Sequence, residues 1–262
     1  MTVTEAARTT YTGKRVRRTE DPRLLAGRGQ YLDDVTVPRM LEAAVLRSPH
    51  AHARIVSIDV NRAKELPGVF DVITGADLAA VAGPQPVIWY PIPDQRIAKT
   101  HALATDRVRW VGQAVAAVAA ANRYIAEDAL ELIDVEFEPL PVAADLEAAL
   151  APDAPRLYED WPDNVSGSLT YTAGNAAQAF AEADVVVGAS FRHARAFACP
   201  LEPRGCIATW DVFSDTLDVW LSTQAPNLAR DLLGEVFGLP VHKIRVRTPD
   251  LGGGFGNKFD FY

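Results

Sequence analysis

The sequence predicts an α+β protein made of two consecutive parts, and three observations lead to that fold class. Short apolar runs alternate with helix-forming runs from about residue 15 to residue 150. A stretch rich in proline and acidic residues, 151–164, then interrupts the alternation. Beyond it, an apolar run at 241–248 is followed by a glycine-rich segment, Leu251-Gly252-Gly253-Gly254-Phe255-Gly256. Glycine lets a ligand approach the main chain, so this segment is the first candidate for a binding site.

The composition describes a soluble globular protein. A chain of 262 residues suits one large domain or two ordinary ones. Hydrophobic residues make up 48% and charged residues 23% of the chain, which is enough apolar material to build a core. The net charge of -8 argues against nucleic-acid binding and against attachment to a membrane through a polybasic surface.

The two cysteines, Cys199 and Cys206, indicate reduced thiols in a cytoplasmic protein and not a disulfide scaffold. Two thiolates also cannot supply the four ligands of a plant-type iron–sulfur cluster. The first twelve residues contain no apolar segment typical of a secretory signal. The longest apolar run, 114–121, is too short to span a bilayer. We therefore expect a cytoplasmic protein with no membrane or nucleic-acid partner.

In the first part, residues 1–13 are predicted to be a disordered tail, and 14–150 an extended arm (14–34) followed by a folded domain. Asn61 and Asn122 are placed to cap helices. The proline-rich stretch 83–94 is predicted to be a loop. Strands are predicted at 41–47, 53–60, 69–74, 108–111, 114–120 and 134–138, and helices at 61–66, 122–132 and 145–150.

Two groups of polar residues in this part admit a metal-site interpretation. His50 and His52 are one residue apart but have no third ligand nearby, so a turn with two solvated imidazoles is the better interpretation. Asp134, Glu136 and Glu138 alternate along a predicted strand, and a solvated strand face is favoured over a metal cluster.

In the second part, 151–164 is predicted to be a linker and 165–262 a second domain. Residues 180–191 are expected to enter a strand through their valine run, and 205–211 and 216–221 to form a hairpin. A helix is predicted from Pro226 to Gly238, with its apolar stripe at Leu228, Leu232, Leu233 and Val236. The predicted strand 241–248 places the glycine segment at the edge of the sheet where strands have their carboxyl ends, and α/β folds often bind ligands there.

The glycine segment does not fit two familiar phosphate-binding motifs. A dinucleotide fingerprint starting at Gly252 would need glycine at Asn257, and a P-loop would need glycine before Lys258 and Ser or Thr after it. On the glycines alone, a hairpin without ligand and a ligand cradle remain equally open. Gln224 precedes the start of a helix, so its amide is either an ordinary turn residue or a ligand contact beside free backbone N–H groups.

Taken together, the motifs resemble the large, molybdenum-binding subunit of the molybdenum hydroxylases, the xanthine oxidase and aldehyde oxidase family. The likeness is closer to the bacterial three-subunit forms that include carbon monoxide dehydrogenase. It covers nearly the whole chain. It rests on Gly13–Arg18 with Gly27–Tyr31, Arg47–Ala53, Val111–Gln113, Glu202–Arg204, Thr223–Pro226 and the Gly-Gly-Gly-Phe-Gly run.

The resemblance implies a hammerhead α/β domain followed by the first part of a molybdopterin-binding α+β domain. It implies a molybdenum–molybdopterin cytosine dinucleotide cofactor, with [2Fe-2S] and FAD on partner subunits. By matching position, Gln224 is expected to hydrogen-bond the metal's oxo ligand or the nearby cofactor. The loop Gly253, Gly254, Phe255 and Gly256 is expected to pass beside the metal with its N–H groups facing the cofactor.

The sequence also departs from the family pattern. Purine-oxidising members carry a substrate-binding glutamate where this chain has Phe259, so an aldehyde, another N-heterocycle or carbon monoxide is the expected substrate. The later segments of the family, with further pterin contacts and the general-base glutamate, have no counterpart here. We therefore expect an incomplete cofactor domain, no catalytic residue in this chain and no activity of the chain alone.

The expected function is the N-terminal part of a subunit that hydroxylates its substrate with water as the oxygen source. Its expected partners are the C-terminal remainder of the large subunit, an iron–sulfur subunit and an FAD subunit. The alternative is a non-catalytic assembly or cofactor-docking module of such a complex. A generic nucleotide-binding α/β protein is disfavoured because both phosphate-binding motifs fail.

Overall fold

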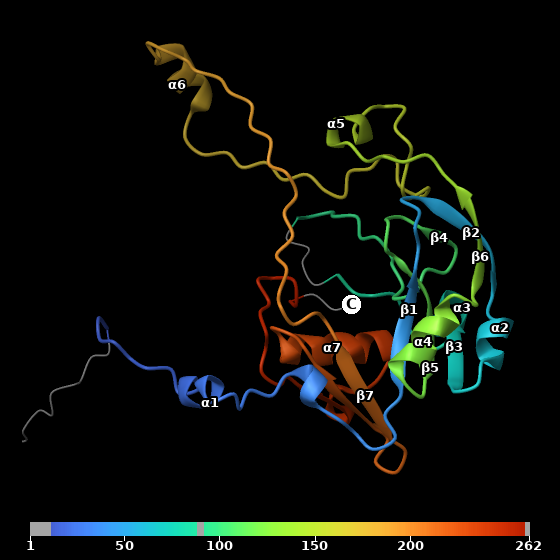
Figure 1. Cartoon of the computed structure of the whole chain (residues 1–262). Helices are drawn as coiled ribbons and strands as arrows, with labels where there is room; N and C mark the ends of the chain where they lie inside the picture. Colours follow the sequence, from blue (N-terminus) through green and yellow to red (C-terminus); the bar gives the residue numbers. More distant parts are fainter. Residues whose placement is uncertain (1–11, 88–91, 260–262) are drawn as a thin grey trace, which may run out of the picture.

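The computed structural model describes residues 12–87 and 92–259. It contains an N-terminal arm, a first α+β domain and a second, smaller α+β domain (Figure 1). Most of the tail predicted at 1–13, part of the loop predicted at 83–94 and the last three residues lie outside the described residues.

The first domain contains two three-stranded antiparallel sheets, ordered β1-β5-β3 and β4-β2-β6. Helix α4 packs against β1 and β5. The elements are β1 (Glu42–Arg47), β2 (Ala53–Asp59), α2 (Asn61–Glu65), β3 (Val69–Thr74), α3 (Gly75–Ala79), β4 (Arg107–Val108), β5 (Ala114–Ala120), α4 (Arg123–Leu130), β6 (Asp134–Pro139) and α5 (Leu146–Ala149).

Strand β5 organises this core because its two faces point to different clusters. Ala116, Val118 and Ala120 are buried against helix α4, whose Ala126 and Ala129 are fully buried. On the opposite face, Val115 is buried in a second cluster with β2 and β4. Small alanine side chains on both the strand and the helix allow the close approach, and a period-two pattern directs successive residues to opposite faces.

Most of the elements predicted for this domain are confirmed, but several details were wrong. The strand predicted at 108–111 is only β4, Arg107–Val108, and helix α3 was not predicted. Asn122 caps α4 as predicted, accepting from the N–H of Ile125 at 3.0 Å. Asn61, in contrast, is the first helical residue of α2, and its N–H donates to the Asp59 carboxylate. His52 is buried and not solvated, with its Nδ1 2.8 Å from the Pro141 carbonyl oxygen. The arm is not extended throughout, because it includes α1 (Asp21–Leu25) and the 3₁₀ turn η1 (Leu32–Asp34).

The acidic face of β6 is solvated, as predicted. Asp134, Glu136 and Glu138 are exposed, and each contacts a side chain of the neighbouring β2 or α2. Within the described residues, no group of three His, Cys, Asp or Glu side chains is placed to hold a metal ion. Nor is any described helix long and apolar enough to cross a membrane.

The stretch 151–164 has no helix or strand, but ion pairs and hydrogen bonds attach it to the first domain. Arg107 pairs with Glu159 at 2.9 Å, and Arg96 pairs with Asp163 at 2.5 Å. Asn164 donates to the carbonyl oxygens of Ala149 and Pro155 at 3.1 and 3.0 Å. These contacts hold the stretch against the first domain.

The second domain is a three-stranded sheet, β7-β8-β9, covered by one long helix. Strands β7 (Cys206–Asp211) and β8 (Thr216–Leu221) form the predicted antiparallel hairpin. Helix α7 (Pro226–Phe237) then crosses to β9 (Ile244–Arg247), which pairs parallel to β8. Val219, Leu233 and Ile244 form the core. Pro226 begins the helix and Gly238 ends it in the left-handed conformation (φ 64°), as predicted.

Two predictions for this domain were wrong in detail. The stretch 241–248 begins with a 3₁₀ turn, η2 (Val241–Lys243), so the strand is shorter than expected. The strand predicted from the valines at 185–187 is absent among the described residues. Helix α6 (Ala176–Glu182) precedes it, and the chain beyond α6 is extended but unpaired. A strand pattern needs a partner strand, and none of the described strands lies beside this run.

Gly75 is the most constrained glycine of the first domain, because a Cβ added there would lie 2.1 Å from the Ala104 carbonyl oxygen. We predict that Gly75→Ala lowers the free energy of unfolding by about 1–3 kcal/mol, since rigid backbone must move to admit the methyl group. Urea unfolding of the chain measures this loss. Gly83→Ala is the control, because its added Cβ would make only an ordinary contact at 3.5 Å. Equal stability of both variants would contradict the prediction.

Candidate cofactor-binding site

The parallel pairing of β8 and β9 brings the two predicted site elements to one edge of the sheet. Gln224 follows the carboxyl end of β8, and the loop 252–256 follows the carboxyl end of β9. Parallel strands joined by a crossover helix end at the same edge, where the following loops meet. The predicted residues Gln224, Gly253, Gly254, Phe255 and Gly256 are therefore brought together.

Gln224 is bonded to the glycine loop through both its backbone and its side chain. Its Oε1 accepts from the N–H of Gly256 at 2.9 Å and from the N–H of Lys258 at 3.4 Å. Its own N–H donates to the Lys258 carbonyl oxygen at 2.8 Å. Because the oxygen of the amide is used by the loop, the group that Gln224 keeps available is its Nε2 donor.

The loop keeps three consecutive backbone donors available. The N–H groups of Gly253, Gly254 and Phe255 donate to no acceptor among the residues that the structure describes. Gly254 is also buried. The Nε2 of Gln224 adds a fourth available donor at this edge, and such a set of donors is complementary to an anionic or acceptor-rich ligand.

The loop's conformation explains its glycines. Gly253 (φ 100°) and Gly256 (φ 88°) lie in the left-handed region, and Phe255 (φ 51°) lies there despite its side chain. A Cβ on Gly254 would lie 2.5 Å from Cδ of Gln224. An alanine at this position would therefore displace the glutamine from the loop. A non-glycine residue with positive φ is uncommon, and such residues cluster at functional sites.

Glu202 and Lys258, to which the sequence analysis assigned no role in the site, hold this loop in position. Lys258 has a fully buried side chain, and its Nζ lies 2.6 Å from Oε2 of Glu202. The same oxygen accepts from the Ser222 hydroxyl at 2.8 Å and from the N–H of Gly252 at 2.9 Å. The other oxygen accepts from the N–H of Leu32, in the arm, at 3.3 Å.

The Glu202 carboxylate is held in its charged form. Burial alone would raise the pKa of this carboxyl, but the hydrogen bonds from Lys258, Gly252, Ser222 and Leu32 outweigh burial and hold the pKa below its ordinary value of 4.5. Through these contacts Glu202 is connected to the residue after β8, Ser222, to the arm at Leu32, and to both ends of the glycine loop, Gly252 and Lys258.

The arm is fixed to the loop a second time, through Asp250. Arg23 donates to both carboxylate oxygens of Asp250, at 2.5 and 2.6 Å. The N–H of Gln30 donates to the same carboxylate at 2.7 Å, and the N–H of Asp250 donates back to the Gln30 carbonyl oxygen at 2.8 Å. The hydrogen bond from Arg23, followed by that from Gln30, lowers the pKa of Asp250 from 3.8 to about 2.

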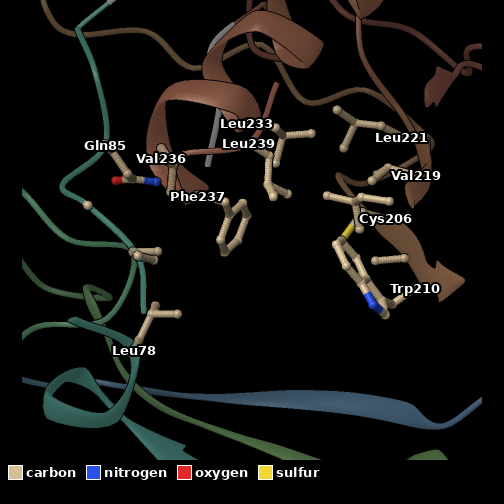
Figure 2. Close-up of a pocket in the computed structure, with 15 residues that line it drawn as sticks. Leu78, Gln85, Cys206, Trp210, Val219, Leu221, Leu233, Val236, Phe237 and Leu239 are labelled. Carbon is tan, nitrogen blue, oxygen red and sulfur yellow. The ribbon is translucent and has the colours of Figure 1, made fainter. Parts of the chain in front are cut away.

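A separate cavity with an apolar lining lies between the two domains. Its volume is about 370 Å³. Trp210 and the Cys206 sulfur line it on one side, and Phe237 and Leu78 line it on others (Figure 2). It separates α3 and the following loop from the β7-β8 hairpin and α7. Its lining residues include no charged side chain, so it has no groups suited to hold an anionic cofactor.

The fold and the donor set define the class of protein: an α+β chain whose second domain presents hydrogen-bond donors at a glycine-loop edge. Comparisons with known proteins identify the family. Residues 26–141 match the family described as aldehyde oxidase and xanthine dehydrogenase, a/b hammerhead domain. Residues 157–262 match the molybdopterin cofactor-binding domain. The chain belongs to the molybdenum hydroxylase large-subunit family, and its fold is the hammerhead and molybdopterin-binding pair of domains.

Individual relatives agree with this assignment. The chain is 41% identical over 95% of its length to the carbon monoxide dehydrogenase large chain of Afipia carboxidovorans, and 40% identical over 94% to the nicotine 6-hydroxylase large subunit of Paenarthrobacter nicotinovorans. It overlays on the crystal structure of quinoline 2-oxidoreductase from Pseudomonas putida 86 with a TM-score of 0.86, 42% identity and 93% coverage. It spans about a third of the length of these relatives: 32%, 30% and 31%.

We predict that the arm stays docked on Asp250 from neutral pH down to about pH 4. A depressed carboxyl pKa contributes stability that is fully present above the ordinary value of 3.8 and is lost as the pH falls through the folded-state pKa of about 2. The NMR shift of the Gln30 amide proton should therefore titrate with a midpoint near 2. Asp250→Asn should abolish this titration. A midpoint near 3.8 in the folded chain would contradict it.

Proposed function

We propose that this chain is the N-terminal part of a molybdenum-dependent hydroxylase subunit and forms one wall of its cofactor pocket. One observation carries the proposal: at one sheet edge, Gln224 and the loop 253–255 present donors that the described residues leave unpaired. Molybdopterin carries phosphate and thiolate groups, which such donors stabilise. The cofactor supplies the redox chemistry when bound, and this chain's residues bind and orient it.

The roles of individual residues follow from the site geometry. The free Nε2 of Gln224 would donate to an acceptor of the cofactor, because its oxygen is committed to Gly256. The N–H groups of Gly253, Gly254 and Phe255 would bind the anionic part, and the turn at Gly256 lets the chain reverse beside it. We propose these five residues as the cofactor-binding set of this chain, with no catalytic residue among them. The general base would come from the remainder of the subunit.

We further propose that the complete enzyme oxidises an aldehyde, an N-heterocycle other than a purine, or carbon monoxide, with water as the oxygen source. Three relatives have names within this range, carbon monoxide dehydrogenase, nicotine 6-hydroxylase and quinoline 2-oxidoreductase, whereas others are named xanthine dehydrogenase. The exclusion of purines therefore rests on Phe259. Phe259 follows the loop and is partly exposed at 46%, so it offers an apolar surface and no carboxylate. A site that lacks a carboxylate cannot pair with the polar edge of a purine as a glutamate would.

The remaining parts of the proposal concern the assembly. The cofactor would be the cytosine dinucleotide form, with [2Fe-2S] and FAD on separate subunits of a cytoplasmic complex. The division of the chain would be an arm and hammerhead domain at 14–150, a connecting stretch at 151–164 and an incomplete cofactor domain at 165–262. Because the cofactor pocket would need residues from the rest of the subunit, the lone chain would be inactive.

The test uses a fusion in which this chain replaces the matching segment of the Afipia carboxidovorans large chain, produced with that enzyme's other subunits. We predict about one molybdenum per fusion, release of cytidine monophosphate on acid hydrolysis, and dye-linked oxidation of carbon monoxide, an aldehyde or an N-heterocycle. Gly254→Ala should lower the molybdenum content at least about tenfold, because its Cβ displaces Gln224. Gly83→Ala, whose Cβ makes only an ordinary contact, is the control.

Three results would count against the proposal. Stoichiometric molybdenum in the lone chain would contradict a pocket shared with the rest of the subunit. Equal molybdenum content in the Gly254→Ala and Gly83→Ala variants would show that the glycine loop does not bind the cofactor. A fusion that binds molybdenum but oxidises no member of the substrate panel would favour the non-catalytic docking module.

A further inference from the structure

Residues 168–199 form a projection in which every residue is exposed. Figure 1 shows α6 at its tip, with long segments leading to it and away from it, well separated from the sheets. This exposure is unusual because the projection is not polar. Val185, Val187 and Phe191 are 77%, 87% and 86% exposed, and Phe180 in α6 is 66% exposed. Large contiguous apolar surfaces of this kind mark interaction sites.

The returning segment of the projection has the side-chain pattern of a β-strand. From 183 to 191 the odd positions are apolar: Ala183, Val185, Val187, Ala189 and Phe191. The even positions 184–192 hold Asp184, Gly188, Ser190 and Arg192, with Val186 as their one large apolar residue. Valine and phenylalanine favour strands, and period-two alternation places the odd residues on one face. The N–H groups of 183–197 donate to no acceptor among the described residues.

The side chains also show which face is free. Arg192, on the even face, reaches the carboxylate of Asp145 at 3.3 Å and so points back toward the first domain. The odd face is therefore directed away from this contact. Beside it, α6 and Val185–Val187 border an open groove of about 300 Å³ lined entirely by apolar residues, namely Ala176, Ala179, Phe180, Ala183 and the three valines.

The length of the relatives indicates that the remaining part of the same polypeptide covers this surface. The carbon monoxide dehydrogenase large chain and quinoline 2-oxidoreductase match this chain over 32% and 31% of their own lengths. Two thirds of each polypeptide is therefore available to pack against the part that corresponds to this chain. A partner subunit would need to bring its own strand edge, whereas the same polypeptide supplies it at high effective concentration.

We propose that residues 183–192 form a β-strand of the complete subunit. The strand pairs through its backbone with a strand from the remaining two thirds of the same polypeptide. The odd face and the apolar groove of α6 pack against that region. This mode is strand addition, in which main-chain hydrogen bonds supply affinity and alternate side chains supply register. The inference rests on the proposed function, because it takes this chain to be part of a longer molybdenum subunit.

Hydrogen exchange of the lone chain and of the fusion described above tests the pairing directly. We predict that amides between Val185 and Phe191 exchange at unprotected rates in the lone chain and at least about 100-fold more slowly in the fusion. Amides of β5 serve as the internal control, since they are paired on both sides in this chain. Unprotected rates at 185–191 in a fusion whose β5 is protected would overturn the proposal.

Two matched variants test whether the odd-numbered face of the proposed strand is the buried one. In the fusion, Phe191→Asp should abolish the protection at 185–191 or prevent folding, because it places a charge on the buried odd face. Ser190→Asp, one residue earlier on the even face, should leave the protection within about threefold. Equal effects of the two variants would overturn the assignment of the face. A fusion that fails to fold while the relative's own large chain folds would show that the surfaces are not complementary.

The molybdenum content separates this inference from the proposed function. A fusion that binds molybdenum with 185–191 unprotected refutes the strand pairing alone. A fusion with 185–191 protected but without molybdenum confirms the pairing and refutes the cofactor assignment.

Discussion

The ion pair between the partly buried Glu202 and the fully buried Lys258 is the interaction on which the Gln224–glycine-loop edge depends. Four donors from four parts of the chain converge on one carboxylate: Lys258, Gly252, Ser222 and the N–H of Leu32. Removing Glu202 would leave the Lys258 ammonium buried without a counter-charge, and removing Lys258 would leave the Glu202 carboxylate without its cation. Either loss costs more than the pair itself contributes to stability. The pair therefore acts as a constraint that permits one arrangement of loop, strand end and arm.

That constraint determines which groups the site presents. Lys258 is fixed by Glu202, and the backbone of Lys258 in turn fixes Gln224 through the 2.8 Å bond to its carbonyl oxygen. Gln224 then uses its oxygen to hold Gly256, which leaves its donor and the loop's N–H groups available. The arm adds a second anchor at Asp250, directly before the loop. Donors fixed in this way are preorganised, which supports the proposal that this edge binds an anionic cofactor.

The local signals in the sequence predicted the local structure well. The Asn122 cap, the stripe and Gly238 stop of α7, and the strand at 114–120 depend on residues close in sequence. The meeting of Gln224 with the glycine loop was also predictable, because a strand–helix–strand order places both loops at one edge.

The contacts that fix the site were not predictable in this way. Glu202 and Lys258 are 56 residues apart, and Arg23 and Asp250 are 227 apart, with no periodic pattern linking them. The valine run at 185–187 has a strand pattern, but a strand forms only where a partner is present, and the described chain offers none.

The most direct test of this account is a double-mutant cycle on the ion pair, measured as the free energy of unfolding of the second domain by hydrogen exchange at β8. Lys258→Met should cost about 3–5 kcal/mol, because it leaves the Glu202 carboxylate without its cation. Adding Glu202→Gln should recover most of that loss, since glutamine keeps an acceptor for Gly252 and Ser222 without the charge. If the single and double variants lose the same stability, the pair does not organise the Gln224–glycine-loop edge.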